Sequence, residues 1–298
     1  MFFKHAIPYR LPIWSVSQET LEKSLGRSAF QPCGQLEMER SGFVLAGETY
    51  ARHVNDHILT VVRTEKKVIP ASAVKRLVEE KAKAIEAAEG YRPGRKRLRE
   101  IKEQVLDELL PKALAKHRDT MIWIAPSAGW IAVEASSFNT AELAIKLLSD
   151  ALGDADFQIA LFHPKQSLAG SMATWLTDDA PAGFTIDREC ELQLPGEERS
   201  TVRYVRHALD GEEVAEHIAA GKMPMWVGMT WSDKISFVLT NDFAFKKIQF
   251  LDVLTEQAAQ EAEDAESAFM AEVTLGAGEL QKLFADMVEA LGGEAEVE

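Results

Sequence analysis

The sequence predicts an α+β fold, built from antiparallel hairpins and sheets with a long helical hairpin arm. Several short runs rich in β-branched or aromatic residues are separated by turn residues, as in antiparallel hairpins. Two consecutive amphipathic helical segments are joined by a short Pro-Gly break. Strands and helices do not alternate in the βαβ order of a parallel sheet, and this favours the α+β class.

Residues 1–71 are expected to form a mixed α+β sub-region. Residues 1–10 alternate loosely between apolar and polar side chains and predict a strand. Ser17 is placed to cap a short helix that carries two leucines. Residues 42–47 and 57–63 are rich in β-branched side chains and predict two further strands.

Residues 72–118 are predicted to form the basic helical hairpin arm. Apolar residues recur at helical spacing from the start of this region, and Gly90 stands where a helix C-cap belongs. After the Pro-Gly break, a second amphipathic helix is expected to run to about Leu110. Pro111 should interrupt it, and a last helical turn or two is expected to reach His117.

Residues 119–250 are predicted to form a second α+β sub-region. Two apolar runs around a Pro-Ser-Ala-Gly turn predict a hairpin over 121–135, and a helix should follow over 140–152. Residues 154–200 show no clear periodicity and receive no assignment. A capping box that begins at Asp210 predicts a short helix. Three more strands are expected at 223–231, 235–240 and 245–250.

Residues 251–298 are predicted to form an acidic helical tail that completes a single full-length unit, 1–298. The tail carries an apolar stripe that ends at Gly292-Gly293. Its members are Leu280, Leu283, Phe284, Met287, Val288 and Leu291. This stripe, like the one at 98–110, is wider than a solvated helix needs, which leaves core packing and a subunit interface as alternatives.

Charge is strongly segregated along the chain, although the formal net charge of −14 disfavours a nucleic-acid ligand. Residues 63–118 hold 16 Lys/Arg against 9 Asp/Glu, whereas residues 251–298 hold 1 against 13. The basic clusters supply nine candidate DNA-binding residues: Arg95, Lys96, Arg97, Arg99, Lys112, Lys116, Arg118, Arg203 and Arg206. Such a surface binds phosphates because each contact releases counterions. The alternative is a solvated hairpin whose cations pair with its own glutamates at helical spacing.

The sequence carries no recognised catalytic, metal-binding or cofactor-binding motif. It lacks a phosphate-binding loop, a dinucleotide fingerprint, HExxH, CxxC and GxSxG. His53 and His57 are four residues apart, but their context predicts two surface histidines. Cys33 is expected to be a buried structural cysteine in a turn. We therefore predict no catalytic residue, no metal ligand and no cofactor.

The expected surroundings of the protein are cytoplasmic and without a membrane partner. The two cysteines fit a reducing compartment, and neither a signal peptide nor a span of about 20 apolar residues is present. Among the tryptophans, Trp123 and Trp130 lie within apolar hairpin strands, so we expect them in the core rather than stacked on bases. No sequence-reading DNA-binding motif is visible, and contact with DNA would therefore be to the backbone.

Short segments along the whole chain carry a specific resemblance. They are FFKHAIPYRL (2–11), AFQPCG (29–34), GFV (42–44), EKKVIPASAVKRLVEEK (65–81), LLPKAL (109–114), MIWI (121–124), EHIAAGK (216–222), ISFVLT (235–240) and GEL…ALGGE (278–294). In their order and coverage, the chain resembles the RdgC family of bacterial recombination-associated proteins. No single segment is a catalytic signature, which agrees with the motif search.

The resemblance implies a non-enzymatic, nucleoid-associated protein that binds double-stranded DNA without sequence preference, and it leaves single-stranded DNA open. It implies crescent-shaped subunits that join at both ends as a homodimer, so that a ring with a basic inner wall surrounds the duplex. Occupied DNA would restrain a RecA-type recombinase. The family's basic positions fall here on the arm and turn residues named above. Relatives with an aromatic residue after the LLP turn differ from this chain, which has Leu114.

Two other function classes remain as alternatives. The chain would be a protein-interaction module if its acidic C-terminal helices bound a recombinase or another DNA-processing protein directly. It would be an enzyme if a dispersed site escaped the motif search. Binding assays on DNA, pull-downs after nuclease treatment and nuclease assays discriminate among the three.

Overall fold

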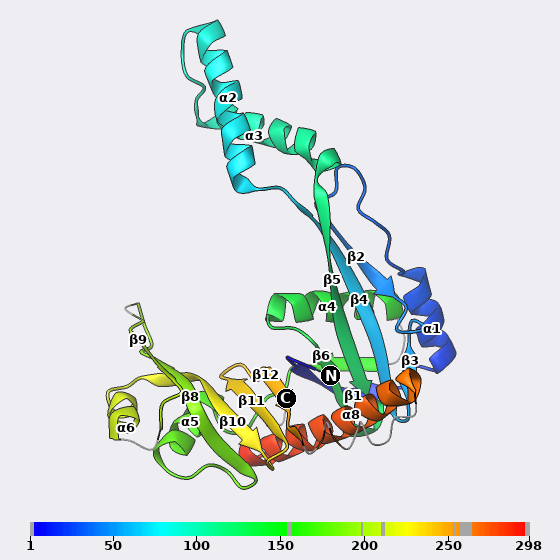
Figure 1. The fold of residues 1–298 in the computed structure, drawn as a ribbon, viewed down its shortest axis with the longest axis vertical. Coiled ribbons are helices and arrows are strands. Elements are labelled where there is room, and N and C mark those ends of the chain that lie inside the picture. The colour runs from blue at the N-terminus through cyan, green and yellow to red at the C-terminus, as the bar shows by residue number, and fades with distance from the viewer. Residues whose placement is uncertain are drawn as a thin grey trace.

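The computed structural model describes residues 3–153, 157–197, 199–209, 212–252, 254, 256 and 264–295. Two sheets and a two-helix arm follow one another along the molecule (Figure 1). Every pairing between the named strands is antiparallel. The predicted α+β class with antiparallel sheets and a helical hairpin arm is therefore confirmed.

The first sheet contains seven strands in the order β2-β4-β5-β6-β1-β7, with β3 paired to β4. The strands are β1 (Ile7–Trp14), β2 (Glu39–Val44), β3 (Arg52–Val54), β4 (His57–Val68), β5 (Leu114–Ala125), β6 (Trp130–Val133) and β7 (Phe157–Ala160). The predicted hairpin over 121–135 is confirmed by β5 and β6. The first predicted strand begins later than expected, because the segment before Ile7 bonds to the second sheet instead.

Three strands continue beyond the body of the first sheet toward the arm (Figure 1). This outer ribbon consists of residues 39–42 of β2, 63–68 of β4 and 114–119 of β5. Cross-strand ion pairs such as Arg63–Asp119 hold it together in place of an apolar face. The helical turn predicted up to His117 is therefore wrong. The helix ends in a 3₁₀ turn, Leu110–Lys112, and the chain then enters β5.

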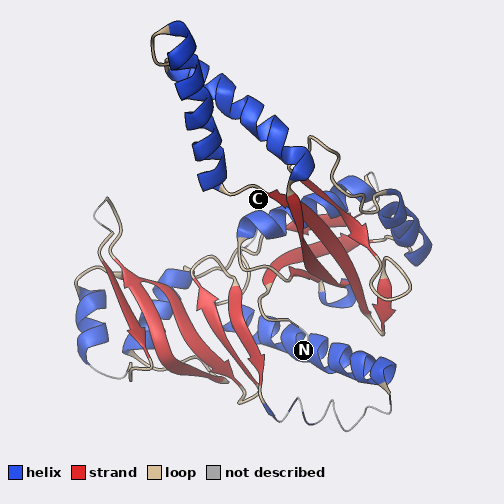
Figure 2. Ribbon diagram, turned by 45° about the horizontal axis from the view of Figure 1, so that its top comes forward, coloured by secondary structure: helices blue, strands red, loops and turns tan. Residues whose placement is uncertain are grey.

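The arm is the predicted helical hairpin, formed by α2 (Ala71–Glu89) and α3 (Arg95–Leu109) (Figure 2). Gly90 ends α2 with a φ of 81°, a left-handed conformation that glycine adopts without a steric penalty. Within the arm, Val74, Ile101 and Val105 are fully buried, and a larger set of apolar side chains is only half-buried. Two helices alone therefore leave part of their apolar stripes uncovered.

Helices α1 (Gln18–Arg27) and α4 (Phe138–Leu152) cover one face of the first sheet. As predicted, Ser17 caps α1, and its Oγ accepts a hydrogen bond from the backbone N–H of Thr20 at 3.2 Å. The helix predicted over 140–152 is confirmed, and it ends at Gly153 as expected. The N-terminal turn of α4 lies beside the base of the outer ribbon, where Arg118 donates a hydrogen bond to the Oγ1 of Thr140.

The second sheet has five strands in the order β12-β11-β10-β8-β9. The strands are β8 (Phe184–Gln193), β9 (Thr201–Val205), β10 (Met223–Trp231), β11 (Ile235–Thr240) and β12 (Phe245–Phe250). Helix α5 (Leu168–Thr177) packs on β10, and α6 (Glu212–Ala219) packs on α5. The three strands predicted after 220 are confirmed, and the region left unassigned contains β7, α5 and β8. Asp210, the start of the predicted capping box, lies outside the described residues.

The long C-terminal helix α8 (Ala265–Ala290) joins the two sheets into one core (Figure 2). The ring of Phe284 lies 6.1 Å from Trp123 and 5.4 Å from Trp130 of the first sheet, and 5.0 Å from Phe245 of the second. The apolar stripe predicted in the C-terminal tail therefore packs in the core. Trp123 and Trp130 are also buried in the core, as predicted. None of the helices in the described ranges is long and apolar enough to cross a bilayer.

Candidate nucleic-acid interface

Four of the predicted DNA-binding residues lie on the exposed first turns of α3, at the far end of the arm. Arg97 forms an ion pair with Glu100 at 2.8 Å. Among the described residues, no carboxylate lies within ion-pair distance of Arg95, Lys96 or Arg99. Cations at a helix N-terminus oppose the helix dipole, by about 0.3–1 kcal/mol each at an exposed site. This arrangement therefore does not contribute to the stability of α3.

A second group of cations is here called the basic wall. Lys66, Lys116 and Arg118 lie on one face of the outer ribbon, and the exposed Lys112 lies in the 3₁₀ turn just before β5. Successive side chains of a strand point to opposite faces, so Lys116 and Arg118 share a face of β5. Lys66 stands directly opposite Lys116 in the register, and like charges in that position destabilise a sheet. Glu39 compensates in part through an ion pair with Lys66 at 2.9 Å.

The basic wall borders a concavity of 740 Å³. Its lining combines Lys66, Lys116 and Arg118 with Asn139 and Thr140 from the first turn of α4. The lining also includes Glu39 and apolar residues such as Met38 and Leu143. The cations and hydrogen-bond donors at this concavity are groups that can bind a phosphate oxygen.

The two remaining predicted residues lie on the second sheet, away from the basic wall. Arg203 of β9 is paired with Glu191 of β8, and its guanidinium carbon lies 5.7 Å from the ring centre of Trp226. Arg206 follows the end of β9 and is exposed, with a φ of 55°. The structure therefore does not bring these two arginines into one cluster with the basic wall, because the arm and β9 lie toward opposite ends of the molecule (Figure 1).

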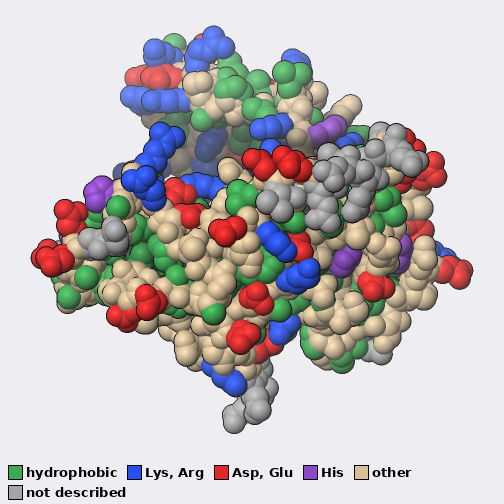
Figure 3. All heavy atoms as spheres, turned by 60° about the horizontal axis from the view of Figure 1, so that its bottom comes forward, with side chains coloured by type: hydrophobic (Ala, Val, Ile, Leu, Met, Phe, Trp, Pro, Cys, Tyr) green, Lys and Arg blue, Asp and Glu red, His purple; other side chains and the backbone are tan. Residues whose placement is uncertain are grey.

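The space-filling view shows the charged side chains on one face of the molecule (Figure 3). Lys and Arg side chains are frequent toward the top of the view, where the arm lies, and both signs of charge are scattered over the face turned to the viewer.

The structure adds basic residues that the sequence did not single out. Lys66 joins the basic wall only because β4 pairs with β5 along its full length. Burial lowers the pKa of His5, and the charges of Lys246, Arg118 and Lys4, which all act on its ring, lower it further. If the alternation of the predicted strand had been followed beyond Arg63, Lys66 would have been recognised as a residue of this strand. No local signal would have paired Lys4 with Lys246.

The opposite face of the outer ribbon anchors the loop before β2. The buried Lys67 ammonium donates to the carbonyl oxygens of Gly34 and Gln35 at 2.6 and 2.8 Å. The buried Glu65 carboxylate accepts from the backbone N–H of Cys33 at 2.8 Å and lies 2.6 Å from the Nε2 of His117. His117 therefore points away from the basic wall.

Neither Cys33 nor the pair of histidines at 53 and 57 forms a catalytic or metal-binding site among the described residues. Burial and the neighbouring Glu65 raise the pKa of Cys33, which opposes a thiolate nucleophile, and its side chain is half-buried rather than buried as predicted. The prediction that His53 and His57 are surface residues is wrong. His57 is 8% exposed and its ring lies edge-on to Trp123, while His53 is half-buried. Across the described ranges, no group of three potential ligands could hold a metal ion.

Several carboxylates of α8 are engaged inside the molecule. Glu279 is buried and pairs with Lys234 and Lys282, and these contacts lower its pKa although burial opposes the shift. Asp286 accepts a hydrogen bond from the indole N–H of Trp231 at 2.8 Å, and Glu266 pairs with Arg52. These contacts hold the helix to both sheets, although the carboxylate of Glu266 remains largely exposed.

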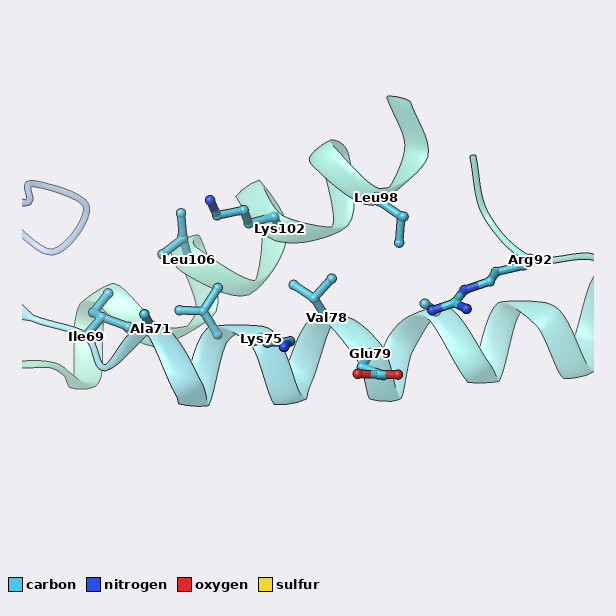
Figure 4. A pocket seen from close by; sticks show the side chains of 11 residues that line it. Ile69, Ala71, Lys75, Val78, Glu79, Arg92, Leu98, Lys102 and Leu106 are labelled. Carbon is cyan, nitrogen blue, oxygen red and sulfur yellow. The ribbon is translucent and has the colours of Figure 1, made fainter. Parts of the chain in front are cut away.

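The arm carries an apolar groove of 580 Å³ between its two helices (Figure 4). Val78, Leu98 and Leu106 line its floor, and Lys75 and Lys102 stand at its rim (Figure 4). At the base of the arm, Leu114 is 83% exposed. Apolar surface of this kind on a small two-helix element is typical of an interaction surface.

Comparison with known proteins identifies the family of the chain. A family model described as "Putative exonuclease, RdgC" matches residues 1–294. The chain is 43% identical over 298 residues to the recombination-associated protein RdgC of Herminiimonas arsenicoxydans, with 99% of each chain covered. It is 44% identical over 298 residues to the protein of that name from Cupriavidus pinatubonensis, with 99% of each covered. The protein of that name from Bordetella pertussis is 39% identical over 301 residues, with both chains covered completely. The resemblance carried by the sequence segments is thereby confirmed, and the chain belongs to the RdgC family of recombination-associated proteins.

Proposed function

We propose that this protein binds double-stranded DNA without sequence preference and acts in recombination by occupying DNA that a RecA-type recombinase would use. The observation that carries the proposal is a set of exposed cations that no described carboxylate neutralises. The set comprises Arg95, Lys96, Arg99, Lys112, Lys116 and Arg118. Two of its features oppose folding stability, namely the cations at the start of α3 and the Lys66–Lys116 pair. A bound polyanion would relieve both.

The proposal includes a homodimer of crescent-shaped subunits that closes a ring around the duplex in the nucleoid. The arm and the second sheet lie toward the two ends of the molecule, and the basic wall lies between them (Figure 1). The apolar groove of the arm and the exposed Leu114 support a contact between copies at the arm end. A two-fold contact at each end would close the assembly without leaving a free interface.

Salt dependence tests DNA binding. Each phosphate neutralised on duplex DNA contributes a slope of about −0.9 to log affinity against log salt, so six contacts predict a slope of roughly −5. Fluorescence anisotropy with random 30-base-pair duplexes between 50 and 200 mM salt measures the slope. Equal slopes for unrelated sequences support backbone binding. Absent binding, or binding independent of salt, contradicts the proposal. Sedimentation of the free protein should show twice the chain mass of 33.1 kDa.

A nuclease is the second candidate, because the matched family description names an exonuclease. We expect purified protein to leave end-labelled linear duplex and single strands intact in magnesium, manganese or a chelator. The reason is that the described residues provide no three-ligand metal group and no activated nucleophile. Progressive shortening from one end that follows the protein through purification, and that a chelator stops, would replace the binding proposal with an enzymatic one.

A further inference from the structure

A small basic cluster lies where the N-terminal segment meets the second sheet. The segment before β1 pairs with β12, with hydrogen bonds of 2.8 and 2.9 Å between the backbones of Ala6 and Phe245. The carbonyl of Lys4 accepts from the N–H of Ile248 at 2.9 Å. Because the segment leads directly into β1, these bonds fix Lys4 and His5 at the junction of the two sheets.

A distortion of β12 orients the ring of His5. The register between β11 and β12 shifts between Ser236 and Val238, and Lys247 has a φ of 52°. This left-handed conformation is uncommon for a residue with a side chain and marks a bulge. At the bulge the N–H of Lys247 turns to the N-terminal segment and donates to the Nδ1 of His5 at 3.3 Å. Backbone strain of this kind is often retained at functional sites.

The bond to Nδ1 determines where the ring carries its proton. A neutral imidazole whose Nδ1 accepts a hydrogen bond has its proton on Nε2. Among the described residues, no acceptor is bonded to that nitrogen. The Nε2–H group is therefore the donor that His5 can offer to a ligand.

The charges around His5 are mainly positive. Lys4 comes from the same segment, Arg118 from β5 and the half-buried Lys246 from β12, and all three act on the ring. The fourth cation nearby, Lys247, is held by both carboxylate oxygens of Glu189 at 2.9 Å. One carboxylate faces the cluster from the end of β6, where Glu134 accepts from the backbone N–H of Lys4 at 3.3 Å. Three cations against one carboxylate leave an excess of positive charge.

We propose that Lys4, His5, Arg118 and Lys246 form a phosphate-binding site that takes up a proton on His5 as it binds a phosphodiester of DNA. The site rests on the proposed function and extends the basic wall, through Arg118, to the junction of the sheets. In the free protein, burial and the three cations disfavour the imidazolium, so the pKa of His5 lies below its usual 6.5. A phosphodiester bound beside the ring adds a negative charge that offsets part of this positive field. The imidazolium is then less unfavourable, and the ring can donate a hydrogen bond from a charged nitrogen.

The sign of the pH dependence follows from this change. The pKa of His5 is low in the free protein and higher in the complex, so binding takes up a proton at pH values between the two. The gain in duplex affinity from the proton on His5 is fully present below the lower pKa, and it is lost as the pH rises through the higher one. Within that window the dissociation constant should rise by up to about tenfold per pH unit.

The test compares the full-length protein with His5→Gln, which keeps polar groups but does not titrate. Duplex affinity is measured from pH 5.5 to 8 at constant ionic strength, with His163→Gln as the matched control because His163 is an exposed loop residue outside both basic clusters. We expect His5→Gln to flatten the pH profile and His163→Gln to preserve it. NMR titration of the His5 ring, assigned by its loss in the variant, should show its pKa rising when duplex is added.

A titration with inorganic phosphate distinguishes a site for the DNA backbone from a site for any phosphate group. A rise in the pKa of His5 with duplex alone indicates a site for the DNA backbone, and a rise with millimolar inorganic phosphate as well indicates a general phosphate site. No rise with either ligand, together with a wild-type pH profile for His5→Gln, overturns the site while leaving duplex binding intact. If the wild-type protein binds no duplex at all, the proposed function itself fails.

Discussion

Replacement of Lys112, Lys116 and Arg118 with glutamine should weaken binding to random duplex by roughly 10²–10³-fold at about 100 mM salt. The reason is that these three exposed cations of the basic wall have no carboxylate partner among the described residues. Their loss removes up to three phosphate contacts, so the slope of log affinity against log salt should become less negative by about 3. Anisotropy titrations over the same salt series as for the wild type measure both quantities.

A control variant with the same change in net charge tests whether the location of the replaced cations determines the loss of duplex binding. Lys23 and Arg27 lie on α1 and Lys165 lies in the loop before α5; all three are exposed and outside the basic wall, and their replacement with glutamine changes the net charge by the same amount. We expect that variant to bind within about twofold of wild type, because distant exposed charges are screened at this salt concentration. Equal losses in the two triple variants would show that total charge, and not the basic wall, governs binding. If Arg95, Lys96 and Arg99 alone matter, the arm is the site.

Replacement of Phe284 with alanine should lower the free energy of unfolding by about 3–5 kcal/mol. Phe284 is fully buried, and its ring contacts aromatic side chains of both sheets. The cavity would therefore lie where α8 holds the sheets together, and it cannot collapse without moving one of them. Urea unfolding followed by far-ultraviolet circular dichroism measures the loss.

Phe269→Ala is the matched control within the same helix. Phe269 is only half-buried, with the guanidinium carbon of Arg52 3.8 Å from its ring centre. Its replacement should lower the free energy of unfolding by about 1 kcal/mol, since less apolar surface is lost and no closed cavity forms. A loss below about 1 kcal/mol for Phe284→Ala would contradict the assignment of α8 as the shared core element.

The elements predicted correctly are those whose apolar residues face one core. The helices α2 and α3 carry clear periodic stripes, and Gly90 marks the end of the first, so the arm could be predicted from local sequence. The outer ribbon could not, because its strands are held by ion pairs such as Arg63–Asp119 and lack an apolar face. In β8 a signal was present but obscured, since Arg188 stands among the buried positions of Phe184, Cys190 and Leu192.

The candidate site was predicted only where its residues are close in sequence. The arm cations form one run, and Lys112, Lys116 and Arg118 follow within a few residues. Lys66 required knowledge of the register between β4 and β5. Lys4 and Lys246 come together only because the N-terminal segment pairs with β12, a contact without any local sequence signal. Arg203 was predicted to be a DNA-binding residue, and the structure gives it an ion-pair partner in Glu191.

The outer ribbon connects the arm to the first sheet, and its stiffness depends on ionic strength. Its six outermost residues on β5 span roughly 20 Å, so a small twist at the base of the ribbon moves the end of the arm much farther. The contacts that resist this twist include the ion pairs Arg63–Asp119 and Lys66–Glu39, and exposed ion pairs weaken as salt rises. The core around α8 depends less on salt, because buried apolar side chains make most of its contacts with the two sheets. Added salt should therefore make the outer ribbon more flexible at concentrations lower than those that affect the core around α8.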